Sequence, residues 1–418
     1  MTGLRSIETK PKGREYSARK GSSSMRKRCF LIALLMIMAA CICGCGANVN
    51  DLVHQGDDAY AQGNYVTALN AYTSVVREGK ATDEIYNNRG MCYMMTEEYD
   101  AAISDFMQAI EMNGASAIYY NNCGLAYYKQ ETYSEAMDMF AKAIELDDTT
   151  AAYYVNHGDC AYELSMSDLC IEDYLKALAM DSTLTHGYNN LASAYFNKAD
   201  YPNAITYYQK AIELEPDKNV LYWNLGEAYR MSGNFEGALD AFNSYEEKSP
   251  YVNIDFLLKR ASVKVELGLL EEAREDYSDA LLQMPTDADL YLGRANVSYA
   301  LEAWNDAISD YGKYLYYQED GVIYGNRGYC YYMLGQWEAA LTDFDKCITL
   351  APDYAWAYYA RGQVKTELQD FEGAKADFDK ATALLDGEEP TWIGEAAGQT
   401  SAEDADGSVE DTSEEDAE

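Results

Sequence analysis

Small and aromatic residues return along most of the chain at one fixed spacing. A Gly or Ala is followed twelve residues later by Ala or Cys and four residues after that by Tyr or Phe, first as Gly56, Ala68 and Tyr72. This pattern has a period of 34 and occurs ten times between residues 49 and 388, with one residue inserted and one missing on the way. At 100° per residue, such positions form one apolar stripe on each of two successive helices.

Each unit of 34 residues therefore predicts two antiparallel helices, which we call helix A and helix B. Gly63, Gly233, Gly268 and Gly335 fall between the two helices of their units. Glycine accepts the backbone angles that end a helix, so these positions are predicted turns. A single unit cannot bury its apolar face alone, and neighbouring units must stack. The sequence thus predicts an all-α fold, an α-solenoid of about ten helix-turn-helix repeats.

The sixth unit, residues 219–252, carries the pattern nearly complete. It has Tyr222, Leu225, Gly226, Tyr229, Ala238, Phe242 and Pro250 at positions 4, 7, 8, 11, 20, 24 and 32. This arrangement resembles the tetratricopeptide repeat. The resemblance implies a right-handed superhelix whose helices A line a concave groove that binds a protein or an extended peptide.

The chain before the repeats has the layout of an export signal. Fifteen apolar residues, 29–43, directly follow three basic residues, 26–28. The apolar run is short for a membrane-spanning helix but typical of a secretory signal. The next residues resemble a bacterial lipobox, with Ile42 at −3 and Gly44 at −1 before Cys45. The resemblance implies cleavage before Cys45 and a diacylglycerol on its thiol.

Residues 1–44 are accordingly predicted to be a basic n-region and a lipoprotein signal peptide, and residues 45–48 the lipidated Cys with a short linker. The protein is then expected at the cell membrane, lipid-anchored and facing the extracytoplasmic side. Three alternatives stand beside this prediction: lipidation at Cys41, an uncleaved signal anchor, and translation that starts at Met25. The sequence does not distinguish a Gram-positive from a Gram-negative envelope.

Charge is distributed very unevenly along the chain. The formal net charge is −38, although the first 28 residues sum to +7 and the remainder therefore to −45. So much negative charge repels phosphate backbones, and nucleic-acid binding is not expected. Residues 389–418 are acidic and nearly free of large apolar side chains, which predicts a disordered tail. This tail is interpreted as solubilising, with docking of a basic partner as the alternative.

The residue types give no sign of an enzyme. His54, His157 and His186 lie in separate repeats, and the acids are interpreted as scattered over helix surfaces. We therefore expect no catalytic residues, no metal, no cofactor and no small-molecule substrate. Six Cys follow the signal and fall at positions of small or buried residues, so they are expected to replace Ala in the core, and pairing into disulfides is the alternative. They are Cys92, Cys123, Cys160, Cys170, Cys330 and Cys347.

Asparagine recurs at position 6 of helix A, on the side opposite the packing stripe. A carboxamide both donates and accepts hydrogen bonds, which suits the backbone of an extended peptide regardless of its side chains. The arrangement is similar to the asparagine ladder of glycosyltransferases that carry tetratricopeptide repeats. The alternatives are hydrogen bonds to neighbouring helices only, or recent duplication of one ancestral unit. The predicted ladder is Asn88, Asn122, Asn156, Asn190, Asn224 and Asn326.

Large apolar side chains are expected beside this ladder, and we include Met91, Tyr128, Phe196 and Trp223 in the predicted peptide-binding groove. The sequence thus predicts a membrane-anchored scaffold that binds a protein or peptide at the bacterial cell envelope. Two rivals remain: an envelope or pilus assembly factor that uses its convex or end surfaces, and a non-catalytic subunit that presents substrate to an enzyme. Neither the partner nor the oligomeric state can be inferred.

Overall fold

The computed structural model describes residues 48–385 and divides the chain into two units, which meet between Glu135 and Ala136. The predicted signal peptide, the predicted lipidation site Cys45 and the acidic tail, residues 389–418, lie outside the described residues. The predictions made for them therefore stay predictions.

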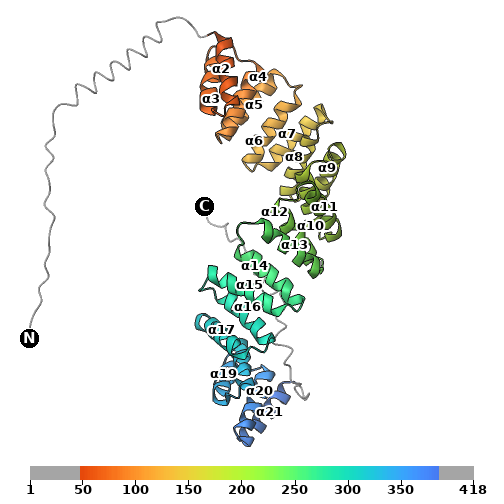
Figure 1. The fold of residues 1–418 in the computed structure, drawn as a ribbon. Coiled ribbons are helices and arrows are strands. Elements are labelled where there is room, and N and C mark those ends of the chain that lie inside the picture. The colour runs from red at the N-terminus through yellow and green to blue at the C-terminus, as the bar shows by residue number, and fades with distance from the viewer. Residues whose placement is uncertain (1–47, 386–418) are drawn as a thin grey trace, which may run out of the picture. The chain divides into compact units, whose positions relative to one another are not determined.

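The first unit holds α2 to α6 and the start of α7 (Figure 1). Within it, each helix from α2 to α5 packs against the next helix of the chain. The bounds are α2 (Val49–Ala61), α3 (Tyr65–Arg77), α4 (Asp83–Met95), α5 (Tyr99–Met112), α6 (Ala117–Lys129) and α7 (Tyr133–Leu146).

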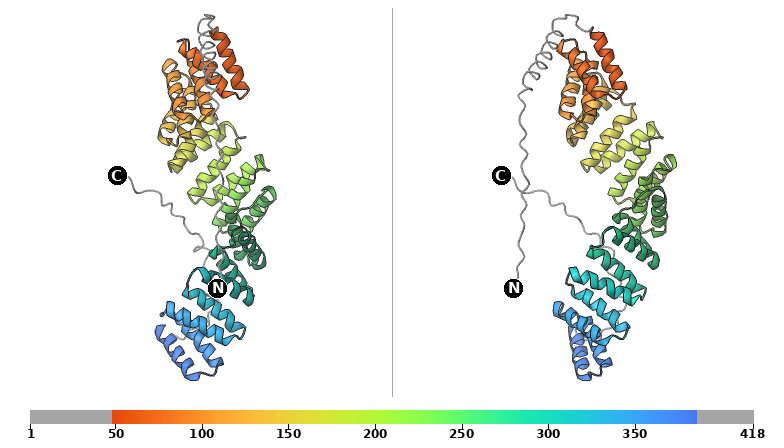
Figure 2. Two further views of the ribbon diagram at one scale, coloured as in Figure 1. Left: turned by 90° about the vertical axis from the view of Figure 1, so that its left-hand side faces the viewer. Right: turned by 60° about the vertical axis from the view of Figure 1, so that its left-hand side comes forward.

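The second unit continues with α8 to α21, and Figure 2 shows its helix pairs following one another in chain order. The bounds are α8 (Ala151–Glu163), α9 (Ser167–Met180), α10 (Thr185–Asn197), α11 (Tyr201–Leu214), α12 (Asn219–Met231), α13 (Phe235–Lys248), α14 (Ile254–Glu266), α15 (Leu270–Gln283), α16 (Ala288–Ala300), α17 (Trp304–Tyr317), α18 (Gly321–Met333), α19 (Trp337–Leu350), α20 (Ala355–Glu367) and α21 (Phe371–Leu384). The predicted all-α fold, an α-solenoid of ten helix-turn-helix repeats, is confirmed.

Close approach of the two helices in a repeat depends on a small residue at position 8. In repeat 6, a Cβ added to Gly226 on α12 would lie 2.5 Å from the Cδ1 atom of Phe242 on α13. The Phe242 ring is fully buried and fills the space that the glycine leaves. Close packing of this kind leaves no room for a further methyl group unless the ring moves.

The turn between helix A and helix B has the same backbone shape in all ten repeats. Its residue at position 15 has a positive φ, between 55° and 77°. Glycine occupies this position in four repeats, as predicted, but the other six use residues with a Cβ. Those six are Glu97, Glu131, Ser165, Ala199, Glu302 and Gln369.

Six acidic residues are buried, so the interpretation of the acids as scattered over helix surfaces is wrong for them. Each is an Asp at position 23 of helix B and pairs with a cationic or imidazole side chain at position 7 of helix A in the same repeat. Burial of the carboxylate requires this partner, because an unpaired charge in a core is costly. The pairs are Arg89–Asp105, His157–Asp173, Arg260–Asp276, Arg294–Asp310, Arg327–Asp343 and Arg361–Asp377.

The six Cys that follow the signal are fully buried and none forms a disulfide, which confirms their prediction as core residues. Burial also raises the pKa of each thiol. In residues 48–385, no cluster of His, Cys, Asp and Glu side chains could hold a metal ion. None of the helices described here is both long and apolar enough to cross a membrane.

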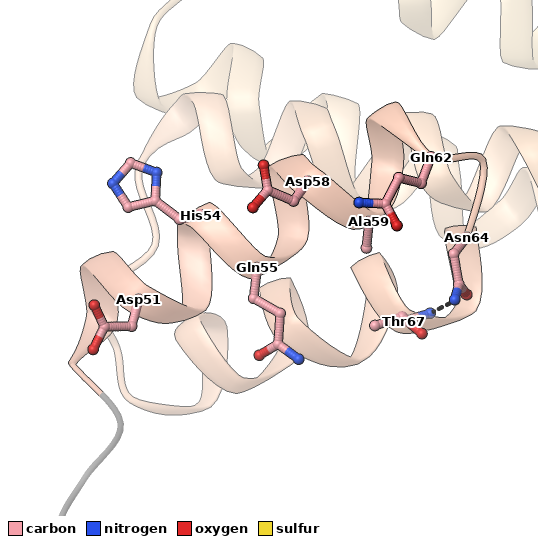
Figure 3. Close-up of a pocket in the computed structure, with 8 residues that line it drawn as sticks. All are labelled: Asp51, His54, Gln55, Asp58, Ala59, Gln62, Asn64 and Thr67. Carbon is pink, nitrogen blue, oxygen red and sulfur yellow. Dashed lines mark hydrogen bonds between the residues drawn. The ribbon is translucent and has the colours of Figure 1, made fainter.

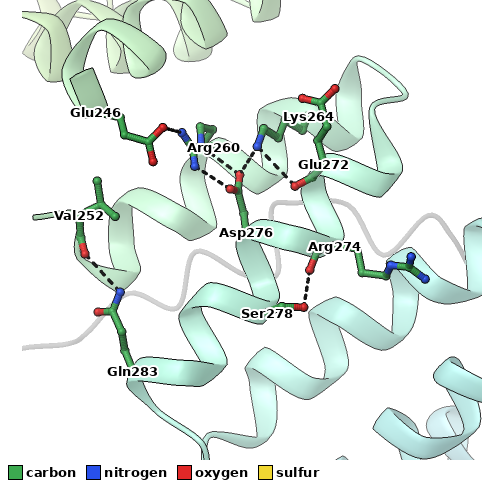
Figure 4. Close-up of polar contacts among 9 residues, drawn as sticks. All are labelled: Glu246, Val252, Arg260, Lys264, Glu272, Arg274, Asp276, Ser278 and Gln283. Carbon is green, nitrogen blue, oxygen red and sulfur yellow. Dashed lines mark hydrogen bonds and ion pairs between the residues drawn. The ribbon is translucent and has the colours of Figure 1, made fainter. Parts of the chain in front are cut away.

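The linker between repeats 6 and 7 is one residue longer than most of the others. Residues 249–253 connect α13 to α14, and Tyr251 in this linker is 85% exposed. A polar cluster joins the two repeats here (Figure 4): the Nη1 atom of Arg260 lies 2.6 Å from Glu246 Oε2 on α13, while Nη2 donates to Asp276 Oδ1 on α15 at 2.7 Å. In most other repeats, the position of Glu246 holds an aliphatic side chain.

The outer face of repeat 1 is polar. In later repeats, one side of helix A faces the preceding repeat. The corresponding positions of α2 hold Asp51, Gln55, Asp58 and Gln62, and all four are exposed. Together with residues at the start of α3, these side chains line a shallow pocket of about 450 Å³ (Figure 3). A solenoid needs such polar faces at its ends, where no further repeat covers the helices.

Candidate peptide-binding surface

Positions 2, 6, 9 and 13 of helix A form a stripe that we call the helix-A surface. On α8 these residues are Ala152, Asn156, Asp159 and Glu163. The outer two are exposed and the inner two are half-buried, whereas most other side chains of α8 are buried. The stripes of α10 and α12 show the same order of exposure. The helix-A surface is therefore the side of helix A that remains open to a ligand after the repeats have stacked.

In the second unit, two of the predicted asparagines, Asn190 and Asn224, belong to a chain of hydrogen bonds between neighbouring helices A. Asn224 Nδ2 on α12 donates to Asn189 Oδ1 on α10 at 2.9 Å, and Asn189 Nδ2 donates to Asn190 Oδ1 at 3.2 Å. Asn190 Nδ2 then donates to Asp159 Oδ1 on α8 at 2.9 Å. The hydroxyl of Tyr174 on α9 donates to the same Asp159 oxygen at 2.8 Å. Three consecutive repeats thus share one polar network.

The first unit contains a shorter network of the same kind. Asn122 Nδ2 on α6 donates to Asn87 Oδ1 on α4 at 2.8 Å, and Asn87 Nδ2 donates to Asn88 Oδ1 at 3.3 Å. Asn122 is only 9% exposed, and Asn326 on α18 in the second unit only 4%. The expectation that position 6 faces away from all packing is wrong for these two residues, because the neighbouring helices A approach closely enough to cover them.

Of the four apolar residues predicted for the groove, Met91 is half-buried on α4. Tyr128 and Phe196 each make an edge contact with the first aromatic residue of the following helix B, with ring centroids 5.3 and 5.6 Å apart. Trp223 instead packs against Phe242 and other aromatic rings of a core cluster. The main contribution of Trp223 is therefore to the packing between repeats 6 and 7, and its contribution to the helix-A surface is smaller.

The asparagine series ends at repeat 7, where Lys259 occupies position 6 of α14. Its ammonium lies 5.0 Å from the ring centroid of Trp223 and 3.1 Å from Glu227 Oε2 on α12. Glu227 also receives hydrogen bonds from Arg230. The carboxylate on the helix-A surface of α12 is thus neutralised by two cations.

Asp159 on α8 differs from Glu227 in this respect. Burial raises the pKa of its carboxyl above the ordinary value, while the hydrogen bonds from Tyr174 and Asn190 and the charge of His186 act in the opposite direction. Among the described residues, no Lys or Arg forms an ion pair with it. Asp159 is therefore a desolvated carboxylate whose hydrogen bonds come from two neutral donors, Tyr174 and Asn190.

Asp159, Asn87 and Asn189 were not among the predicted site residues. A signal for the two asparagines was present, because repeats 2, 3 and 5 share the sequence Tyr-Asn-Asn at residues 86–88, 120–122 and 188–190. The second Asn of each pair was interpreted as a peptide ligand, but the first is what connects the repeats in the two networks described.

Models of one family match the chain at residues 81–149, 189–253, 258–322, 322–354 and 357–384, all described as the tetratricopeptide repeat. Together these matches cover more than half of the 418 residues. The chain belongs to the tetratricopeptide repeat family. Repeats 2, 3 and 5 to 10 lie largely within the matched segments of this tetratricopeptide repeat protein.

Individual relatives are distant or short. The human tetratricopeptide repeat protein 12 is 37% identical over 54 residues, which are 13% of this chain and 8% of that protein, so the match spans less than a tenth of the curated relative. YrrB, described as a tetratricopeptide repeat protein with an unusual peptide-binding site, is 22% identical, with a TM-score of 0.39 over 43% of this chain and 93% of that chain. PilW, a type IV pilus biogenesis factor, is 18% identical, with a TM-score of 0.45 over 50% and 96%. At such identities the likeness concerns the fold alone.

Proposed function

We propose that this tetratricopeptide repeat protein is a lipid-anchored scaffold of the bacterial cell envelope that holds an extended segment of another protein on its helix-A surface. The observation that carries the proposal is the polar network of α8, α10 and α12, which lies half-buried on the open side of the repeats. Side-chain amides at this depth keep acceptor and donor capacity that a peptide backbone can use. The anchor is proposed from the lipobox-like sequence before Cys45.

The proposal is tested by removing two network amides, in the variant Asn190→Ala with Asn224→Ala. Tagged wild type and variant are recovered from membranes of the native cell after cross-linking, and bound proteins are identified by mass spectrometry. We expect the variant to bind its partner about five- to a hundredfold more weakly, because each hydrogen bond contributes about 0.5 to 1.5 kcal/mol. Asn203→Ala, on the exposed side of α11, is the matched control and should bind as wild type does. Circular dichroism verifies that each variant is folded.

A second candidate function, assembly through the opposite surface, is favoured by an apolar patch on helices B. Leu282 on α15 and Tyr316 on α17 are 82% and 81% exposed at the same position of adjacent repeats. Glu, Thr, Arg or Ala occupies this position in the other repeats. If Leu282→Ser with Tyr316→Ser loses the partner while the double Asn variant keeps it, the assembly function replaces the scaffold function proposed above.

A further inference from the structure

We infer that Asp159 forms a subsite for a basic side chain, lysine or arginine, of the segment that the helix-A surface binds; this inference rests on the proposed function. The supporting observations are the location of Asp159, the way its oxygen atoms are used, and the treatment of every comparable carboxylate elsewhere in the second unit.

Asp159 lies on the open side of the repeats and is half-buried there. It belongs to the helix-A surface of α8, one turn before the exposed Glu163 and one turn after the half-buried Asn156. Asn190, which bonds to it, lies on the corresponding stripe of α10. A ligand on this surface would therefore lie beside Asp159.

The two oxygen atoms of this carboxylate have different surroundings. Oδ1 accepts the hydrogen bonds from both Tyr174 and Asn190. A carboxylate offers about four lone-pair sites. Tyr174 and Asn190 use sites on Oδ1, so the sites on Oδ2 remain available to another donor. The two bonds fix the plane of the group, so Oδ2 is pre-positioned to accept from an incoming donor. Preorganisation of this kind reduces the entropy lost on binding.

A cation is the donor that best matches this oxygen. The buried Asp residues at position 23 of the second unit each pair with an Arg or His, and Glu227 pairs with Arg230 and Lys259. Asp159 departs from this rule, although its surroundings are desolvated enough to strengthen any Coulomb attraction. Glu163 is exposed one turn away and adds a second negative charge. A Lys or Arg adds the attraction of opposite charges to the hydrogen bond, and a neutral backbone amide does not.

The chain offers a control for the charge of Asp159 outside the helix-A surface. Asp240 lies on α13, a helix B, and is exposed. The substitution Asp159→Asn removes the negative charge and keeps an oxygen that can accept from Tyr174 and Asn190. Asp240→Asn makes the same chemical change away from the proposed binding surface.

The probe is a phage-displayed library of random twelve-residue peptides, selected on the full-length wild-type chain. Selected peptides are synthesised, and their dissociation constants are measured by fluorescence anisotropy with wild type, Asp159→Asn and Asp240→Asn. We expect a Lys or Arg at one fixed position of the selected peptides. Asp159→Asn should weaken their binding about ten- to a hundredfold, as loss of a hydrogen bond to a charged group does. Asp240→Asn should leave it unchanged.

The possible outcomes separate the subsite from the proposed function. Peptides that bind wild type and Asp159→Asn equally, or that carry no basic residue at a fixed position, overturn the subsite and leave the peptide-binding function standing. Failure to select any peptide, or selection of peptides whose binding survives Asn190→Ala with Asn224→Ala, overturns the proposed function itself. Circular dichroism spectra that match wild type show that Asp159→Asn acts through charge and not through the fold.

Discussion

The residue types at positions 7 and 23 vary together in every repeat. Six repeats combine Arg or His with Asp, while the other four place no charge at either position, as with Leu225 and Ala241 in repeat 6. The spacing of 16 residues is visible in the sequence, yet the hydrophobic period alone does not reveal it. Only the helix geometry shows that the two positions face each other, and this is why the buried pairs were missed.

Coupling at these positions predicts a specific double-mutant result. Arg89→Leu alone leaves the buried Asp105 without its cation and should lower the free energy of unfolding by about 3 to 5 kcal/mol. Adding Asp105→Ala recreates the combination found in repeat 6 and should recover most of that loss. Denaturant unfolding of wild type, both single variants and the double variant measures the coupling. A double variant no more stable than Arg89→Leu would show that the pair does not act as a unit.

The pair in repeat 10 also predicts a pH dependence. Burial by itself would raise the pKa of Asp377, but hydrogen bonds from Arg361 and Lys365 outweigh it and hold the pKa below its ordinary value. A carboxyl with a lowered pKa in the folded state contributes stability above its unfolded pKa, about 4, and loses it as the pH falls further. Asp377→Asn should therefore lower the melting temperature at pH 7, and its difference from wild type should shrink below pH 4. Asp379→Asn, exposed on the same helix, should change little at either pH.

At the scale of single elements, the helices were predictable and their turns only partly so. The 34-residue period predicts two helices in each repeat, because recurring Gly, Ala and aromatic residues mark the packing stripe of each helix. Turns with Gly63, Gly233, Gly268 and Gly335 were predicted from glycine. The same left-handed turn forms at Glu97 and five other residues, where stacking of the helices imposes a conformation that the local sequence does not favour.

Substitution at one of these turns should therefore stabilise the protein. Ala199 between α10 and α11 has φ 57°, which costs a residue with a Cβ about 1 kcal/mol. Ala199→Gly should raise the free energy of unfolding by about 0.5 kcal/mol, since glycine also loses more entropy on folding. The reverse change, Gly233→Ala at the same turn of repeat 6, should lower it. Thermal melts of both variants test the sign, and destabilisation by Ala199→Gly would mean that the left-handed turn is not strained.

For the whole molecule, the sequence predicted the repeat array from residue 49 onward and its family, because the period is long and repeated ten times. Its surface was less predictable. Positions 6 and 9 were expected to be open, yet neighbouring helices A bring asparagines from successive repeats into hydrogen-bond contact. Such contacts depend on how repeats stack, which no single repeat encodes. The ladder asparagines thus stabilise the stack, and any ligand must bind to a network that already exists.

The proposed attachment to the membrane concerns the whole molecule and leads to the last prediction. The chain after residue 28 has a net charge of −45, so anionic lipid repels it, and the proposed anchor alone would hold the protein at a membrane. Cys45→Ala should release the chain into the soluble fraction or leave an uncleaved precursor, whereas Cys41→Ala should behave as wild type does. Wild type should stay in the membrane pellet in 1 M salt, because two or more acyl chains hold it by burial of hydrocarbon. Intact mass determines which Cys carries lipid. Membrane retention of both variants with an unmodified wild-type Cys45 would favour the signal anchor, and release of Cys41→Ala with retention of Cys45→Ala would favour lipidation at Cys41.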